Sequence, residues 1–222
     1  MTRRLLPALA FLAVVLAVIR SAFYTPLEAK QGAAQKIFYI HVPAAWVAFL
    51  AFFIVAVASG IYLWVRDPRL DQLAESSAEV GVVFTTIVLI TGPLWAKPIW
   101  GTWWAWWDVR LVSTLFLWFI YVSYLVLRGA VESPGLRARY SAILGILGAL
   151  LIPFIHLSVY LFSTMHPKPI IGKPDKPSLP SEMLITFLIS FFAFTLLYFA
   201  FLRSRYAYAV ERDARAARIE NA

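Results

Sequence analysis

The sequence predicts an all-α integral membrane protein with six transmembrane helices. Hydrophobic residues make up 61% of the 222 residues and charged residues only 14%. Together with a mean hydropathy of +0.75, this composition excludes an ordinary soluble domain. Apolar runs of roughly 20 residues, the length that crosses about 30 Å of hydrocarbon, recur along the whole chain.

Short segments rich in charges and turn residues separate the apolar runs, for example at 66–69 and 133–135. We expect spans at about 5–23, 37–65, 79–94, 109–127, 140–162 and 183–202. The third span is the shortest because it is expected to stop at Gly92 and Pro93. Without a repeat or a separate soluble stretch, residues 1–222 are expected to form a single membrane domain with a solvated helical tail within 203–222.

The first apolar run is expected to be a retained helix and not a cleaved signal peptide. Arg3 and Arg4 precede it, as in a signal peptide, but no small-residue cleavage pattern follows. Arg20 also stands where the apolar region of a signal peptide would end cleanly.

Orientation follows from the 20 Lys and Arg residues. With six crossings both termini share one side, and that side carries the larger share of the basic residues, so we expect it to be cytoplasmic. The net charge of +8 is therefore explained by topology, without nucleic acid as a partner. The basic residues left on the outer side, which fit an anionic ligand or partner, are Arg20, Lys30, Lys36, Lys97, Arg110, Lys168, Lys173 and Lys176.

Tryptophan is concentrated in one segment, WGTWWAWWD at 100–108, which follows Trp95 closely. This Trp-rich outer loop, about 95–110, lies between the third and fourth expected spans and therefore on the outer side. His41, at the start of the second span, and His166, just beyond the fifth, are expected on the same face. His156 lies inside the fifth span, where an ionisable group usually faces the bundle interior.

Two imidazoles beside clustered indoles at a membrane surface point to haem. Histidine is a common axial ligand of haem iron, and indole rings offer large rigid apolar surfaces with an N–H donor. Lys97 and Arg110 in the same loop could pair with the haem propionates. His156 remains a competing iron ligand. The chain has no Cys, which excludes thiolate ligation and a thioether link to this chain.

Other interpretations stay open at this point. An interfacial aromatic belt accounts for one or two Trp per helix end, but not for the density near residue 100. A cytochrome b subunit for electron transfer would hold haem between His pairs inside its spans. A structural subunit that contacts quinone or lipid, or a haem lyase, would also be a membrane protein. Asp108 precedes the fourth span, where it can cap the helix or take part in chemistry.

Several stretches resemble one family of membrane haem-handling proteins. WGTWWAWWDVRLVS is similar to the tryptophan-rich "WWD" signature of such proteins. FYIHVPAAW resembles, more specifically, the haem exporter protein C family (CcmC) of the cytochrome c maturation pathway. The similarity extends to KPIWGTWW, IPFIHLSV and STMHPKP, and it covers most of the chain in order. Related cytochrome c synthases carry the same signature on larger scaffolds than 222 residues.

The resemblance implies a haem b site on the outer face, with His41 and His166 as axial ligands. It implies a haem platform made of Trp100, Gly101, Trp103, Trp104, Trp106, Trp107 and Asp108, to which the spacing adds Trp95. The family pattern is usually WWxWD, whereas this chain has WWAWWD, so either Trp106 or Trp107 can occupy the family position.

The resemblance also implies a function and partners. The family loads haem onto a periplasmic haem chaperone at the bacterial inner membrane, for cytochrome c maturation. It acts with an ABC-type ATPase, the membrane subunit of that ATPase and a small single-helix protein. No Walker motif occurs in this chain, so ATP hydrolysis is expected in a partner. We therefore expect a haem-transfer subunit and not an enzyme.

Overall fold

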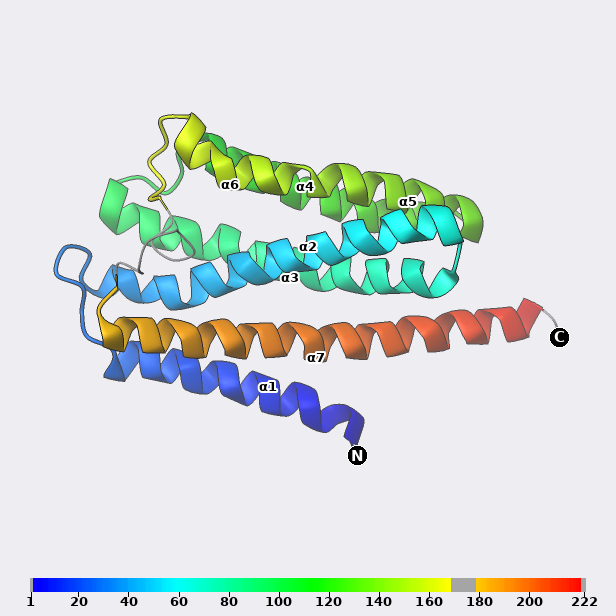
Figure 1. Cartoon of the computed structure of the whole chain (residues 1–222), viewed down its shortest axis with the longest axis horizontal. Helices are drawn as coiled ribbons and strands as arrows, with labels where there is room; N and C mark the ends of the chain where they lie inside the picture. The colour runs from blue at the N-terminus through cyan, green and yellow to red at the C-terminus, as the bar shows by residue number, and fades with distance from the viewer. Residues whose placement is uncertain (1, 169–178, 221–222) are drawn as a thin grey trace.

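The computed structural model describes residues 2–168 and 179–220, which form helices packed side by side (Figure 1). In chain order the elements are α1 (Thr2–Ile19), a π-helical turn (Arg20–Tyr24), a 3-10 turn (Ala33–Ile37), α2 (Phe38–Val65), α3 (Pro68–Trp100), α4 (Val109–Ala130), α5 (Pro134–Ala149), α6 (Leu151–Leu161) and α7 (Ser181–Glu220). Six helical stretches are long and apolar enough to cross a membrane, and the described residues hold no β-strand. The predicted all-α class with six spans is confirmed.

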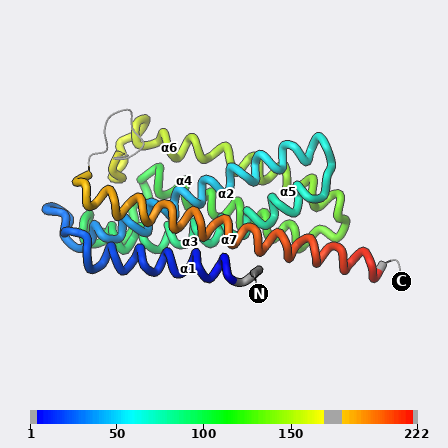
Figure 2. Tube along the Cα trace, turned by 60° about the horizontal axis from the view of Figure 1, so that its bottom comes forward, coloured from blue at the N-terminus to red at the C-terminus, as the bar shows by residue number. Residues whose placement is uncertain are grey.

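The helices form three rows. Figure 1 shows α1 and α7 along one side, α2 and α3 in the middle, and α4, α5 and α6 along the other side. In the turned view of Figure 2, α7 runs across the front of the bundle and α1 lies along its edge. We call the end that carries residues 95–108 the Trp end. The start of α1 and the end of α7 both point away from it.

Helix α2 supplies the centre of the core. Its small buried residues Ala44, Ala48 and Ala51 let neighbouring helices approach closely, which favours helix association where lipid gives no hydrophobic drive. Phe52 is fully buried and stacks on Tyr121 of α4, with ring centroids 3.6 Å apart and planes at 8°. This stack joins the middle row to the α4 side of the bundle.

Buried hydroxyl groups make the polar contacts between spans. Ser77 of α3 donates to the Ala51 carbonyl at 2.8 Å and therefore accepts from Tyr198 of α7 at 2.7 Å. Tyr121 of α4 donates to the Gly145 carbonyl of α5 at 2.7 Å. Each hydroxyl donor thereby has an acceptor within the protein, which hydrocarbon could not provide.

The third span is longer than predicted. Helix α3 begins at Pro68, where the Asp67 carboxylate accepts from the Arg69 N–H at 2.9 Å, and it continues through Pro93 to Trp100. The prediction that Gly92 and Pro93 end the helix was wrong. A proline removes one backbone hydrogen bond, and neighbouring helices in a membrane bundle can offset that loss.

The fifth span is broken at Leu150 into α5 and α6. Pro153 explains the break, because its ring would clash with the carbonyl four residues earlier, at Ala149, where α5 ends. The span therefore reaches across the bundle in two pieces.

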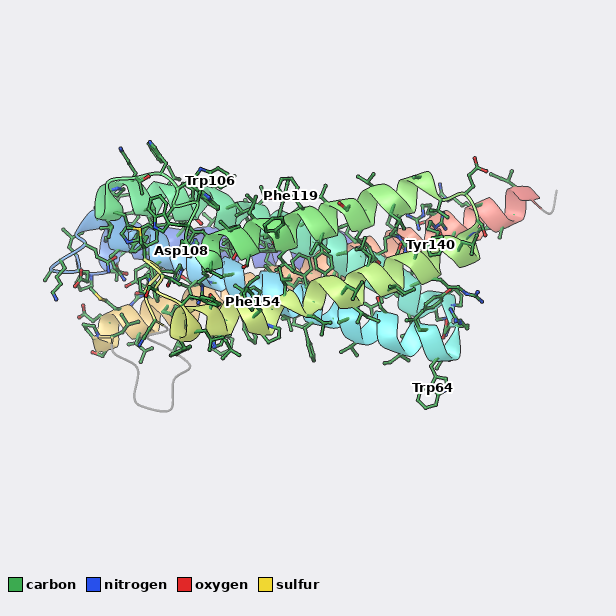
Figure 3. All side chains as sticks on the ribbon, turned by 90° about the horizontal axis from the view of Figure 1, so that it is seen from above. Trp64, Trp106, Asp108, Phe119, Tyr140 and Phe154 are labelled. Carbon is green, nitrogen blue, oxygen red and sulfur yellow. The ribbon has the colours of Figure 1, made fainter. Side chains whose placement is uncertain are left out.

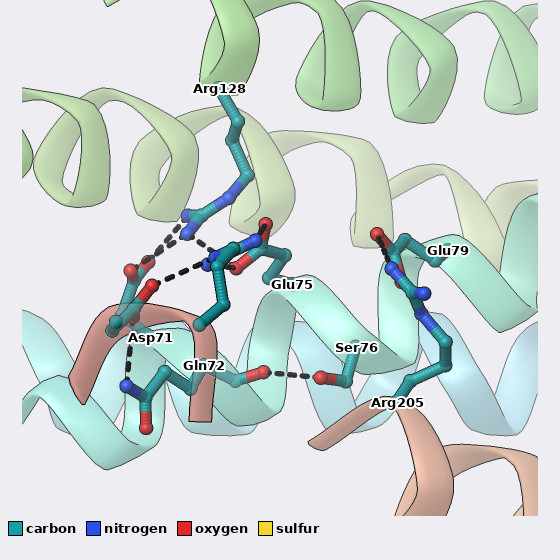
Figure 4. A network of polar contacts seen from close by, with 9 residues as sticks. Asp71, Gln72, Glu75, Ser76, Glu79, Arg128 and Arg205 are labelled. Atoms are coloured by element: carbon teal, nitrogen blue, oxygen red, sulfur yellow. Dashed lines mark hydrogen bonds and ion pairs between the residues drawn. The ribbon is translucent and has the colours of Figure 1, made fainter. Parts of the chain in front are cut away.

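The end opposite the Trp end holds a buried ion-pair network, which we call the charged end (Figure 4). Asp71 and Glu75 of α3, four residues apart, lie on one helix face. Arg128 of α4 is only 6% exposed and contacts Asp71 at 2.6 Å and Glu75 at 3.0 Å. Arg212 of α7 shares Glu75 at 2.8 Å. The network ties α3, α4 and α7 together.

The tail of the chain is helical, as predicted, because α7 continues to Glu220. Its last part, from Glu211 to Ile219, is mostly exposed, and only Arg212 and Asp213 are partly buried. Arg205 pairs with Glu79, and Gln72 donates to Asp213 at 2.8 Å. These contacts arise because the polar first turns of α3 extend alongside α7.

The close contact of α2 and α3 at Gly81 gives a stability prediction. An added Cβ would lie 2.5 Å from Cε1 of Phe52, a ring that Tyr121 holds in place. We expect Gly81→Ala to lower the free energy of unfolding by about 1–3 kcal/mol, because the added methyl group overpacks the contact. Gly60 of α2, with nothing within 4 Å of such a Cβ, is the matched control, and Gly60→Ala should leave the melting temperature equal or higher. A wild-type melting temperature for Gly81→Ala in detergent would contradict the packing described.

The charged end gives a second prediction. Arg128→Met would leave Asp71 without an ion-pair partner among the described residues and Glu75 with Arg212 alone. Breaking a buried pair in this way typically costs about 3–5 kcal/mol. We therefore expect a clearly lower melting temperature in detergent. Arg215, 70% exposed and paired with Glu211, serves as control, and Arg215→Met should cost less than about 1 kcal/mol. Equal effects of the two substitutions would show that the network is not needed for stability.

Candidate functional site

His41 lies in the first turn of α2 with its ring turned toward α3. Its Nδ1 is 2.9 Å from Oγ1 of Thr91, and that hydroxyl donates its proton to the Ile87 carbonyl at 2.7 Å. Thr91 must therefore accept from His41, so the imidazole proton is on Nδ1. The Nε2 lone pair of His41 is left free.

His166 lies in the irregular segment after α6, four residues beyond Phe162. Its Nδ1 is 2.9 Å from the Pro167 carbonyl, which can only accept, so Nδ1 carries the proton here too. Partial burial, with Arg110 nearby, lowers the pKa of His166 to about 4. The ring is thus neutral at pH 7, which is the state that ligates a metal.

The fold brings these two histidines together. His41 and His166 lie within electrostatic reach of each other, and Arg110 acts on both. Each ring donates from Nδ1 to an oxygen, as metal-ligating histidines usually do, and keeps Nε2 free. Both rings are therefore in the tautomer that leaves Nε2 available as a ligand atom.

The Trp-rich segment is shorter as a loop than the predicted 95–110. Helix α3 carries Trp95 and Trp100, and α4 begins at Val109, so only 101–108 is non-helical. Gly101 ends α3 with φ 77°, a left-handed conformation that favours glycine, and its N–H donates to the Lys97 carbonyl at 3.1 Å.

The indoles of the Trp-rich segment form two groups. Trp95 and Trp100 pack edge to face at 5.0 Å, and the Nε1 of Trp95 donates to Gln31 at 2.8 Å. These two rings are therefore held by the protein itself.

Three of the remaining indoles are mostly exposed, although Trp106 also packs edge to face on the partly buried Trp104 at 5.8 Å. Trp103 is 55% exposed, and Trp106 and Trp107 are each 71% exposed. The last two occupy a turn closed by the hydrogen bond from the Asp108 N–H to the Ala105 carbonyl at 3.1 Å, and Trp106 points outward in Figure 3. The turn presents both candidates for the family position, so the structure does not choose between them.

Asp108 is completely buried at the start of α4. One carboxylate oxygen accepts from the N–H groups of Arg110 and Leu111 at 3.0 and 3.2 Å, which confirms the predicted capping role. The other accepts from the Met165 N–H at 2.7 Å. The Trp-rich segment and the His166 segment are thereby joined.

The two cations predicted to face a ligand differ in their partners. Lys97 donates to the Gly101 carbonyl at 3.0 Å and lies over the Trp103 ring. Among the described residues, Nη1 of Arg110 and Nε1 of Trp104 are buried without a hydrogen-bond partner. An anionic ligand could satisfy both donors. Nε of Arg128 and Nε of Arg137, in other parts of the bundle, are likewise buried without a partner in the described part of the chain.

Of the other basic residues predicted on the outer side, Lys36 has a structural role, and two lie outside the described residues. Lys36 donates to the carbonyls of Ser21, Ala22 and Thr25 at 2.7–2.9 Å, which satisfies the exposed end of the first span. Lys36 is therefore not free for an anionic ligand. Lys173 and Lys176 lie outside the described residues.

His156 is not where the sequence analysis placed it. The buried face of α6 is formed by Ile155, Ser158 and Val159, and His156 falls on the exposed face beside them. The expectation of a buried residue was wrong, because the α6 register turns position 156 outward. His156 does not join the other two histidines.

Comparison with known proteins decides the family. The family model described as CcmC, heme exporter protein C, matches residues 1–220. The chain belongs to this family. The match covers the Trp-rich segment and both histidine segments.

Among the most similar relatives is the heme exporter protein C of Bradyrhizobium diazoefficiens, 39% identical over 89% of this chain and 76% of the relative. The Haemophilus influenzae protein of the same name is 34% identical over 88% of this chain and 80% of its own length. A ccmC-like mitochondrial protein of cytochrome c biosynthesis from Marchantia polymorpha is 34% identical over 83% and 78%.

Sequence reasoning missed the residues that hold the site together. Thr91 fixes the proton of His41, Gln31 holds Trp95, and Met165 supplies the N–H that Asp108 binds. A hydroxyl beside Gly92 within an apolar span was the one available signal. An added Cβ at Gly92 would lie 3.5 Å from Cε1 of His41, so that ring packs against the α3 backbone.

Proposed function

We propose that this chain binds haem b at the Trp end, with His41 and His166 as axial ligands, and delivers it to a periplasmic haem chaperone. Membership of the heme exporter protein C family gives the chain a role in haem handling for cytochrome c maturation. The observation that carries the proposal is the pair of neighbouring imidazoles whose Nδ1–H groups are bonded and whose Nε2 atoms are free.

The residues present fit haem as a cargo. Trp103, Trp106 and Trp107 offer exposed apolar surface to a flat macrocycle. The unpartnered Nη1 of Arg110 and Nε1 of Trp104 are donors that propionate carboxylates could accept from. Lys97 is a weaker candidate because its ammonium already donates to Gly101.

The two proposed ligands stand on different kinds of backbone, and this difference favours the release of haem to a partner. His41 stands on α2, whose core face is buried along its length. His166 stands on an irregular segment, which can move without disturbing a span. A partner that displaces the His166 segment would remove one axial ligand and weaken retention. Binding is then reversible, and the chain transfers haem without forming a covalent bond to the porphyrin.

The surroundings and partners complete the proposal. The bias of Lys and Arg toward the opposite side supports a periplasmic Trp end in a bacterial-type inner membrane. Energy for release would come from an ABC-type ATPase that acts with its membrane subunit and a small single-helix protein.

The alternatives have less support. A cytochrome b subunit for electron transfer would need histidine pairs between spans, whereas His156 lies on an exposed face. No observation favours a haem lyase.

Visible spectra of haem-loaded variants test the proposal. We expect a six-coordinate low-spin b-type spectrum in the wild type, lost in His41→Ala and in His166→Ala because each removes an axial ligand. His156→Ala is the matched control and should keep the wild-type spectrum. A wild type that stays colourless after added haem, or loss in His156→Ala alone, would contradict the site.

The proposed role of Arg110 gives a separate prediction. Loss of a charge-assisted hydrogen bond costs about 1.5–3 kcal/mol, so Arg110→Gln should weaken haem binding roughly 10- to 100-fold. Lys97→Gln, the control, should weaken it much less. With haem dimethyl ester, which lacks carboxylates, the Arg110→Gln effect should disappear in equilibrium titrations. The same loss with the ester as with haem would contradict propionate binding by Arg110.

A further inference from the structure

The carboxylate of Asp108 makes two kinds of contact at once. Its Oδ1 caps α4 through two N–H groups, and its Oδ2 accepts from the Met165 N–H at 2.7 Å. Asp108 is 0% exposed, so neither oxygen is left facing solvent. Helix capping alone requires only the first contact.

The second contact reaches the residue next to His166. Among the described residues, the other hydrogen bonds of 162–168 stay within this segment or return to α6. They run from Phe162 N–H to the Ser158 carbonyl, from the Thr164 hydroxyl to the His166 carbonyl, and from the His166 ring to Pro167. The hydrogen bond to Asp108 is thus the one that ties this segment to another span.

We propose that Asp108 is a positioning residue that holds His166 in place for its ligand. This inference rests on the proposed function and departs from the sequence-based expectation that Asp108 contacts haem as part of the platform. The three N–H groups already use the carboxylate, and its burial leaves no free edge for a macrocycle. Asp108 acts through the Met165 N–H, while the indoles beside it offer the apolar surface.

The chain contains a matched residue with the capping role only. Asp67 caps α3 by accepting from the Arg69 N–H at 2.9 Å, and among the described residues it bonds no distant segment. Asn caps helices about as well as Asp. In Asp108→Asn the remaining oxygen can keep the cap, but the amide NH2 cannot accept from Met165, so only the link to the His166 segment is lost.

A second pair of variants changes the donor of the hydrogen bond between Met165 and Asp108. Met165→Pro removes the N–H and leaves Asp108 untouched, whereas Met165→Ala keeps the N–H and serves as its control. If Asp108→Asn disturbs folding of α4, the Met165 pair still tests the link.

The experiment combines hydrogen exchange of the haem-free protein with spectra of the haem-loaded protein. We expect the backbone amides of 162–168 to exchange at least about tenfold faster in Asp108→Asn and in Met165→Pro. Each variant loses a hydrogen bond worth about 1.5 kcal/mol or more, which lowers the free energy of local opening by that amount. Their haem spectra should lose the six-coordinate form, and added imidazole should restore it. Asp67→Asn and Met165→Ala should resemble the wild type in both measurements.

Two results would overturn the inference. Unchanged exchange with an unchanged spectrum would reduce Asp108 to a helix cap. Unchanged exchange with haem binding lost and not restored by imidazole would make Asp108 a direct haem contact. If even the wild type bound no haem, the proposed function would fall, but faster exchange in the two variants would still uphold the link between Asp108 and the His166 segment.

Discussion

Hydrocarbon offers no hydrogen-bond partner, so every backbone polar group within the bundle must be satisfied by the chain itself. The rest of this structure follows from that constraint. It makes the spans helical, and it requires a side chain or a turn wherever a helix stops. Lys36 closes the end of the first span on three carbonyls, and Gly101 closes α3 through a left-handed residue. Asp108 then opens α4 eight residues after Trp100.

The two ends of the bundle meet this constraint differently. At the charged end, the carboxylates of Asp71, Glu75 and Glu79 are all paired with arginines, which fixes α3 against α4 and α7. At the Trp end, Arg110 and Trp104 keep buried donors without partners, and exposed indoles lie beside them. Polar groups that are paired inside a protein stabilise it, whereas unpaired donors are expected where a ligand will supply the acceptor. Nε of Arg128 at the charged end also has no partner among the described residues, so the two ends differ mainly in the exposed indoles and the two histidines of the Trp end.

The predicted fold depended on hydrophobic run lengths, and these were sufficient for six spans because span length is set by the membrane. Details set by single contacts were missed. Gly92 and Pro93 read as a helix end, yet α3 passes through them, and the polar turns from Pro68 onward belong to α3 because arginines of distant helices pair with its acids. The only sign of the break at Leu150 in the sequence is Pro153. A proline does not always break a helix, because α3 continues through Pro93.

The candidate site divides in the same way. Residue type and topology were enough to place His41, His166 and the Trp-rich segment at one end of the bundle. They could not give the direction of a side chain, so His156 was expected to face inward and instead faces out. Nor could they reveal a backbone donor as a partner. The Met165 N–H has no signature in the sequence, although it connects Asp108 to the segment that carries His166.

The central claim is that both free Nε2 atoms bind one iron. The most direct test is a crystal structure of the haem-loaded protein with the iron located by its anomalous scattering. The account predicts iron bonded to Nε2 of His41 and to Nε2 of His166, with the Nδ1 atoms still bonded to Thr91 and Pro167. Iron bonded through Nδ1 of either ring, or held at His156, would contradict it.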